Sequence, residues 1–99
     1  MNINKTLENG KLTFILDGRL DSTTAPRLQD VLIPAFNEGG EVGLDFAQLA
    51  YLSSAGLRVL LMALKTAKTK GASMSISGVS QEIMEVFEMT GFSEMLTFT

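Results

Sequence analysis

Apolar and polar residues alternate over two short stretches near the beginning of the chain. Between Lys11 and Asp17 every second residue is apolar, so those side chains share one face of an extended chain. A weaker run covers residues 1–7, and the turn sequence Asn9-Gly10 separates the two. Asn-Gly between two such runs is a strong signal for a β-hairpin. The first part of the chain therefore predicts two antiparallel strands.

A helical period follows the loop Gly18–Thr24, which is rich in residues that cap helices. Pro26 suits the first turn of this helix. Pro34 removes a backbone hydrogen bond and clashes with the preceding turn, so we expect a kink or an early end there. Gly39-Gly40 is expected to close the element. The apolar residues that share one face of this helix are Leu28, Val31, Leu32, Ala35 and Phe36.

A second helix is predicted from Ala55 to Lys70, and Gly71 stops it. Val59 and Met62 fall on the outward side of this helix, together with Arg58. Two apolar residues on an outward face indicate either a patch that docks a partner or ordinary scattered surface apolarity. The stripe expected to face the core consists of Leu57, Leu60, Leu61, Leu64 and Ala67.

The remaining elements alternate between strands and helices, and they complete an α/β pattern. They are strands at 41–46 and 73–77, a loop at 47–54, a third helix between the cap Ser80 and Gly91, and an optional last strand at 95–98. The order ββαβαβα, with or without a final β, predicts a mixed four- to five-stranded β-sheet with three α-helices. Neither a repeat nor a linker divides the chain, so residues 1–99 are expected to form a single domain.

Composition narrows the chemistry further, because the 99 residues include neither cysteine nor histidine. Disulfides, thiolate chemistry, the usual zinc ligands and the usual general base are therefore excluded. We expect no enzymatic activity, no catalytic residue, no bound metal and no cofactor.

Charge and hydropathy exclude other classes of partner. The net charge is −3 and the eight basic residues are scattered, which argues against nucleic-acid binding. No apolar stretch has the length of a membrane span, and the N-terminus lacks the apolar core of a signal peptide. A cytoplasmic protein without membrane insertion is expected.

Two serines, Ser53 and Ser54, stand directly before the second predicted helix. One interpretation is structural, because a serine hydroxyl that caps a helix contributes about 1 kcal/mol. The other is regulatory, because an exposed serine at this position is open to a kinase. A helix N-terminus favours an anion by roughly 0.3–1 kcal/mol, so an added phosphate is expected to spare the fold. It would instead act on a partner that docks there, through about −1.5 to −2 added charges.

Three segments carry a resemblance to a known family. The string LDFAQLAYLSSAGLRVLL at residues 44–61 resembles the signature of STAS domains of the anti-sigma factor antagonist type, in which a strand leads to a D-S-x-G-L segment that opens a helix. Residues 18–25 resemble the family's G-x-L-D loop, and residues 77–92 resemble its later helix-and-glycine segment. The resemblance covers nearly the whole chain and implies a STAS-like sheet.

The resemblance also implies a function, which is partner switching in transcription regulation. Antagonists of this type bind an anti-sigma factor that is also a serine kinase. The kinase uses ATP to phosphorylate them, which breaks the complex, and a serine phosphatase reverses the reaction. Ser54 takes the phosphoserine position, two residues before Gly56. Ser53 replaces an aspartate that is common in the family and remains a rival acceptor, and Ala55 replaces a frequent Ser or Thr.

The expected partner surface joins the first loop to the start of the second helix. It comprises Asp21, Ser22, Thr23, Ser53, Gly56, Arg58, Val59 and Met62. The alternative function is that of a non-regulatory STAS subunit that docks constitutively on the ATPase of a lipid-transport ABC transporter.

Overall fold

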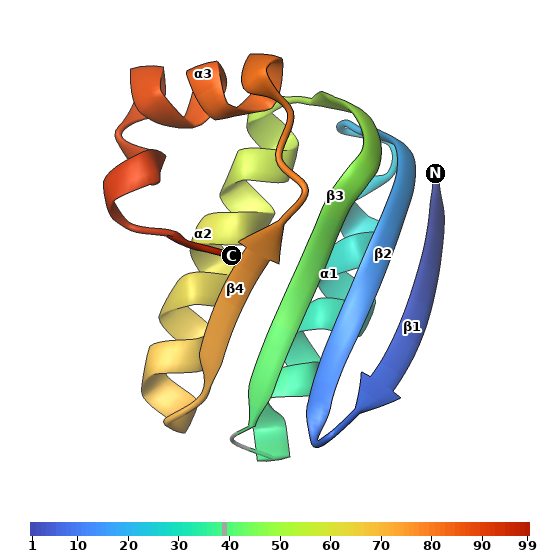
Figure 1. Ribbon diagram of the computed structural model, residues 1–99, viewed down its shortest axis with the longest axis vertical. Helices are drawn as coiled ribbons and strands as arrows, with labels where there is room; N and C mark the ends of the chain where they lie inside the picture. The colour runs from blue at the N-terminus through green and yellow to red at the C-terminus, as the bar shows by residue number, and fades with distance from the viewer. Residues whose placement is uncertain (39) are drawn as a thin grey trace.

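Residues 1–38 and 40–99, which the computed structural model describes, form a mixed five-stranded sheet and three α-helices (Figure 1). The strands lie side by side in chain order: β1 (Asn2–Glu8), β2 (Lys11–Leu20), β3 (Glu41–Leu52), β4 (Ser73–Ser77) and β5 (Thr97–Phe98). The helices are α1 (Ala25–Ala35), α2 (Ser54–Lys70) and α3 (Gln81–Thr90), and two short 3-10 turns cover Phe36–Glu38 and Phe92–Glu94. β1 is antiparallel to β2, and every other neighbouring pair is parallel. The predicted fold class and element order are confirmed.

Helices α1 and α2 cover one face of the sheet, and α3 crosses the end at which β3 and β4 finish (Figure 1). Right-handed crossovers place both connecting helices on the same side, since β2, β3 and β4 succeed one another in the sheet. The core lies between this face and the helices. Its largest fully buried side chains are Phe36, Phe46, Phe87, Leu16, Leu20, Leu28, Leu32, Leu44 and Leu60. None of the described helices is long and apolar enough to cross a membrane.

The predicted hairpin is confirmed at the residue level. Glu8 pairs with Lys11, so Asn9 and Gly10 alone form the turn. Both have positive φ, 51° and 80°, which is the requirement of a type I′ turn.

The predicted loop at 47–54 is wrong for most of its length, because β3 continues to Leu52. β2 likewise continues beyond Asp17 to Leu20. The pairing of these strands shifts register after Ile15 and again after Gly18. Such irregularities break the strict alternation of apolar and polar residues, which is why the end of each strand was missed.

Helix α1 ends at Ala35, one residue after Pro34, which confirms the predicted early end of this helix. Leu28, Leu32 and Phe36 are buried as expected, whereas Val31 is 42% exposed and faces a groove described below. Gly39, part of the predicted stop, lies outside the described residues.

The predicted core stripe of α2 is partly wrong. Val59, expected to face outward, is only 4% exposed, and Met62 is half-buried. Leu57, Leu61 and Leu64 are also only half-buried. The buried residues of this helix are Gly56, Val59, Leu60, Ala63 and Ala67. One flank of α2 packs against the neighbouring α1 as well as against the sheet. The hydrophobic period of a single helix carries no information about this second contact, so the prediction missed it.

Candidate functional site

The carboxyl ends of β2 and β3 meet at one edge of the sheet because the two strands are parallel. The Ser53 N–H donates a hydrogen bond to the Leu20 carbonyl at 2.9 Å. This bond joins the loop that follows β2 to the start of α2. Residues about 30 positions apart in sequence therefore form one continuous surface.

The two serines occupy different positions at the start of α2. Ser53 is the extended N-cap residue, and its hydroxyl accepts a hydrogen bond from the Gly56 N–H at 3.4 Å. The first intrahelical bond also reaches back to this residue, from Leu57 N–H to the Ser53 carbonyl at 3.0 Å. Ser54 is the first helical residue and is exposed to solvent. The cap interpretation thus applies to Ser53 and leaves the side chain of Ser54 available.

Gly56 brings the start of α2 unusually close to the strands. A Cβ atom at this position would lie 2.7 Å from Leu52 Cδ1 and 2.8 Å from Leu20 Cγ. Gly56 is buried, so its contribution to a partner surface is to set the position of its neighbours rather than to touch a partner.

A compact loop follows β2 and is held by Asp21. One carboxylate oxygen of Asp21 accepts hydrogen bonds from the N–H groups of Thr23 at 3.0 Å and Thr24 at 3.2 Å. The Thr24 hydroxyl accepts from the Asp21 N–H at 2.9 Å and lies 2.7 Å from the Arg19 carbonyl oxygen, to which it donates. These bonds leave Ser22 and Thr23 exposed at the tip of the loop.

Electrostatics favour the ionised form of Asp21. Partial desolvation acts to raise the pKa of its carboxyl group, but the hydrogen bonds from Thr24 and Thr23 and the charge of Arg19 outweigh it and lower this pKa below the ordinary 3.8. Arg19 Nε lies 3.8 Å from Asp21 Oδ2, and the Arg19 guanidinium stacks over the Tyr51 ring at 4.1 Å from its centroid. The edge of the site therefore presents a carboxylate that accepts backbone hydrogen bonds and, beside it, an exposed cation stacked on an aromatic ring.

A shallow hollow of about 240 Å³ separates the first turns of α1 and α2. Four residues of the predicted partner surface line it together, namely Ser22, Arg58, Val59 and Met62; the other lining residues are Ala25, Pro26, Gln29 and Ala55. Val59 forms part of its floor, since it is buried, while Arg58 is exposed at the rim. The structure thus places Ser54, the Asp21 loop and this hollow at one end of the molecule.

Sequence reasoning missed several members of this surface. Pro26 and Gln29 stand three residues apart on α1, a spacing that places them on one helix face, but only the packing of α1 on α2 gives that face a role. The sequence predicts a loop at Tyr51, and its pairing with Arg19 across β2 and β3 is visible only in the structure.

The fold and this strand edge define a STAS domain, and comparison with known proteins agrees. A family model described as "Mlab, STAS domain" matches residues 2–97. The chain belongs to the STAS domain family, as the sequence resemblance predicted.

The similar proteins include antagonists of anti-sigma factors. The chain is 34% identical over 80 residues to an anti-sigma-B factor antagonist of Staphylococcus epidermidis, covering 80% of this chain and 74% of that protein. It is 26% identical over 98 residues to an anti-sigma-B factor antagonist of Bacillus subtilis, covering 97% and 90%. A solved anti-sigma-factor antagonist (STAS) domain protein of Planctomyces limnophilus superposes with a TM-score of 0.85 at 18% identity, covering 98% and 87%.

Proposed function

We propose that this chain is an anti-sigma factor antagonist that binds an anti-sigma factor with serine kinase activity and is released when Ser54 is phosphorylated. The observation that carries the proposal is the exposure of Ser54 at the first position of α2, beside the Asp21 loop and the hollow between α1 and α2. The name of the Staphylococcus epidermidis relative supports the class of partner.

The geometry favours Ser54 over Ser53 as the phosphate acceptor. The Ser53 hydroxyl is engaged with the Gly56 N–H, and its backbone N–H is bonded to Leu20. A kinase acting on Ser53 would have to break the helix cap, at a cost of about 1 kcal/mol. A kinase acting on Ser54 meets a side chain that already faces solvent.

A phosphate on Ser54 changes binding more than folding. It would lie at the positive end of a 17-residue helix whose first turn contains no acidic residue. The charge is thus tolerated by the domain itself. At a docked interface, an uncompensated charge costs roughly 2–5 kcal/mol, which is one to more than three powers of ten in affinity.

Arg58 supplies a second element of the switch. It stands four residues after Ser54 on α2, so the two side chains lie on the same face one turn apart. In the unmodified protein its exposed guanidinium is available to a carboxylate of the partner. A phosphate on Ser54 competes for the same guanidinium, so modification both adds a repulsive charge and withdraws an attractive one.

A phosphorylation assay tests the acceptor. The wild type, Ser54→Ala and Ser53→Ala proteins are incubated with the cognate anti-sigma factor kinase and ATP, and intact mass counts the phosphates. We expect one phosphate on the wild type and on Ser53→Ala, and none on Ser54→Ala. A labelled Ser54→Ala protein would overturn the assignment.

A second candidate is the constitutive subunit of a lipid-transport ABC ATPase. The hollow floored by Val59 and Met62 favours it, because apolar docking there needs no phosphate. Replacing Met62 with Glu is then expected to abolish binding to the ATPase, while Ser54→Ala and Ser54→Asp bind it equally. Under the leading proposal, the two Ser54 variants differ in affinity for the anti-sigma factor.

A further inference from the structure

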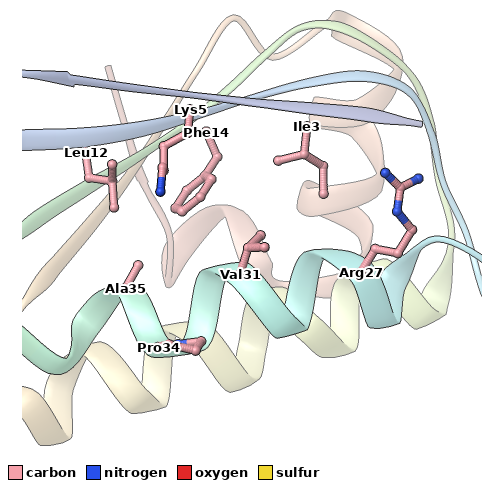
Figure 2. Close-up of a pocket in the computed structure, with 8 residues that line it drawn as sticks. All are labelled: Ile3, Lys5, Leu12, Phe14, Arg27, Val31, Pro34 and Ala35. Atoms are coloured by element: carbon pink, nitrogen blue, oxygen red, sulfur yellow. The ribbon is translucent and has the colours of Figure 1, made fainter.

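A second and larger hollow lies on the other flank of α1, away from α2. It is a groove of about 530 Å³ between α1 and the hairpin formed by β1 and β2 (Figure 2). Its volume falls in the range of small-molecule sites, roughly 300–1,000 Å³. The lining residues are Ile3, Lys5, Leu12, Phe14, Arg27, Val31, Pro34 and Ala35.

The floor of this groove is apolar, and its charges have one sign. Phe14 is 2% exposed and forms the base, while Val31, 42% exposed, forms part of the α1 wall. Among the residues that the structure describes, Lys5 and Arg27 line the groove and no carboxylate does, although the whole chain carries a net charge of −3. An apolar trough with cations in an acidic protein is complementary to an anion with an apolar body.

The two cations have different surroundings. One Arg27 Nη donates a hydrogen bond to the Met1 carbonyl at 2.6 Å, which turns the guanidinium away from the floor and leaves its stem to close one end of the groove. Lys5 pairs with Phe14 across β1 and β2, so both side chains point to the α1 side of the sheet. Among the described residues, the ion pairs are Lys11 with Glu41 and Arg19 with Asp21, which leaves the Lys5 ammonium without a carboxylate. Figure 2 shows that ammonium directed into the groove.

We propose that this groove binds a free alkyl carboxylate of medium length, with the carboxylate at Lys5 and the chain along Phe14, Ile3 and Val31 toward the stem of Arg27. The length of the α1 wall sets the length of the alkyl chain that fits in the groove. From Arg27 to Ala35 the helix rises about 12 Å, which an extended chain of about eight to ten carbons spans. Burial of this chain supplies the attraction, and Lys5 supplies the preference for an anion.

Decanoate, kept below its micelle concentration, is the probe, and amide chemical shifts of the isotope-labelled protein are the readout. We expect saturable shifts at residues around the groove, chiefly Ile3, Lys5, Leu12 and Val31, and small ones at Ser54. Decanol and decyltrimethylammonium serve as neutral and cationic controls of the same chain length. Both are expected to bind more weakly than decanoate.

Three variants separate the contributions. Lys5→Met keeps the stem and removes the charge, and it should weaken decanoate about fivefold, as for an exposed ion pair, without affecting decanol. Val31→Trp fills the groove from an exposed helix position and should abolish binding of both. Lys68→Met removes the same charge from the exposed last turn of α2 and should change nothing.

A lysine on an edge strand also discourages strand pairing, and the same experiment separates that role from ligand binding. The proposal is overturned if decanoate produces no saturable shifts at the groove. It is equally overturned if decanol and decyltrimethylammonium bind as well as decanoate, or if Lys5→Met and Lys68→Met behave alike.

Discussion

Helices α2 and α3 begin and end with the same devices. Ser53 caps α2 by accepting from Gly56 N–H at 3.4 Å, and Ser80 caps α3 by accepting from Ile83 N–H at 3.2 Å. Each helix stops at a glycine in the left-handed conformation. A serine cap is therefore a structural feature that the molecule uses twice.

The residues that follow the two caps differ. Ser54 follows the first cap, in a first turn without an acidic residue, whereas Gln81 and Glu82 follow the second. The start of α2 is also bonded to the end of β2, beside the Asp21 loop. The start of α2 therefore differs from the start of α3 in three respects: an exposed hydroxyl follows the cap, the first turn contains no acidic residue, and the end of β2 lies beside it.

A negative charge at the first helical position should have very different effects on partner binding in α2 and in α3. Ser54→Asp should weaken binding to the anti-sigma factor kinase by roughly ten- to a thousandfold, since it places an uncompensated charge in the interface. Gln81→Asp adds the same charge at the same position of α3 and should leave this affinity unchanged. Titration calorimetry measures both, and equal losses would show that the two helix starts are equivalent.

Gly56 and Ile83 occupy the third helical position of α2 and α3, and Gly56 lies against side chains of two strands. Gly56→Ala should lower the free energy of unfolding by about 1–2 kcal/mol, because overpacking against Leu20 and Leu52 outweighs the gain in helix propensity. Urea denaturation measures the loss. A stabilised Gly56→Ala protein would mean that this end of the helix is free to move outward.

The two caps themselves should be equivalent in stability. Ser53→Ala and Ser80→Ala should each cost about 1 kcal/mol in urea denaturation. Their difference should appear only in function, since Ser53 belongs to the proposed interface and the start of α3 does not. If Ser80→Ala weakens partner binding as much as Ser53→Ala does, the interface also includes the start of α3, which crosses the same end of the sheet (Figure 1).

The smallest effect concerns Asp21, for which α3 has no counterpart. Its pKa is lower in the folded protein than the ordinary 3.8, so the unfolded chain binds more protons as the solution becomes acidic. The stability contributed by the carboxylate is therefore complete above about pH 4 and is lost as the pH falls through the lowered pKa. Asp21→Asn should be less stable than the wild type near pH 7, and the difference should narrow as the pH falls below about 4. A gap independent of pH would assign the effect to packing.

The sequence predicted those elements whose signals are local. The Asn9-Gly10 turn, β4 and the ends of α3 at Ser80 and Gly91 lie where the turn and cap residues placed them. These features depend on backbone conformations that a few residue types favour strongly.

The errors concern features that depend on distant neighbours. The predicted third strand ends too early, at residue 46, because the pairing of β3 with β2 contains register shifts that disturb the apolar–polar alternation. The prediction that Val59 faces outward is wrong because Val59 is buried where α2 packs against α1, a contact that the period of a single helix does not reveal. The serine pair is a local signal and is visible in the sequence. The hollow beside it is not, since Pro26 and Met62 meet only in the folded protein.

The bond from Ser53 N–H to the Leu20 carbonyl has a consequence for the diversification of such proteins. It joins the ends of two strands that lie far apart in the sequence, one followed by the proposed phosphate acceptor and the other by the exposed Ser22 and Thr23. Under the proposed function, substitutions at these two loop residues can alter which partner is recognised without changing the serine proposed to be phosphorylated. On that proposal, duplicated genes can keep one phosphorylated serine while their products come to recognise different partners.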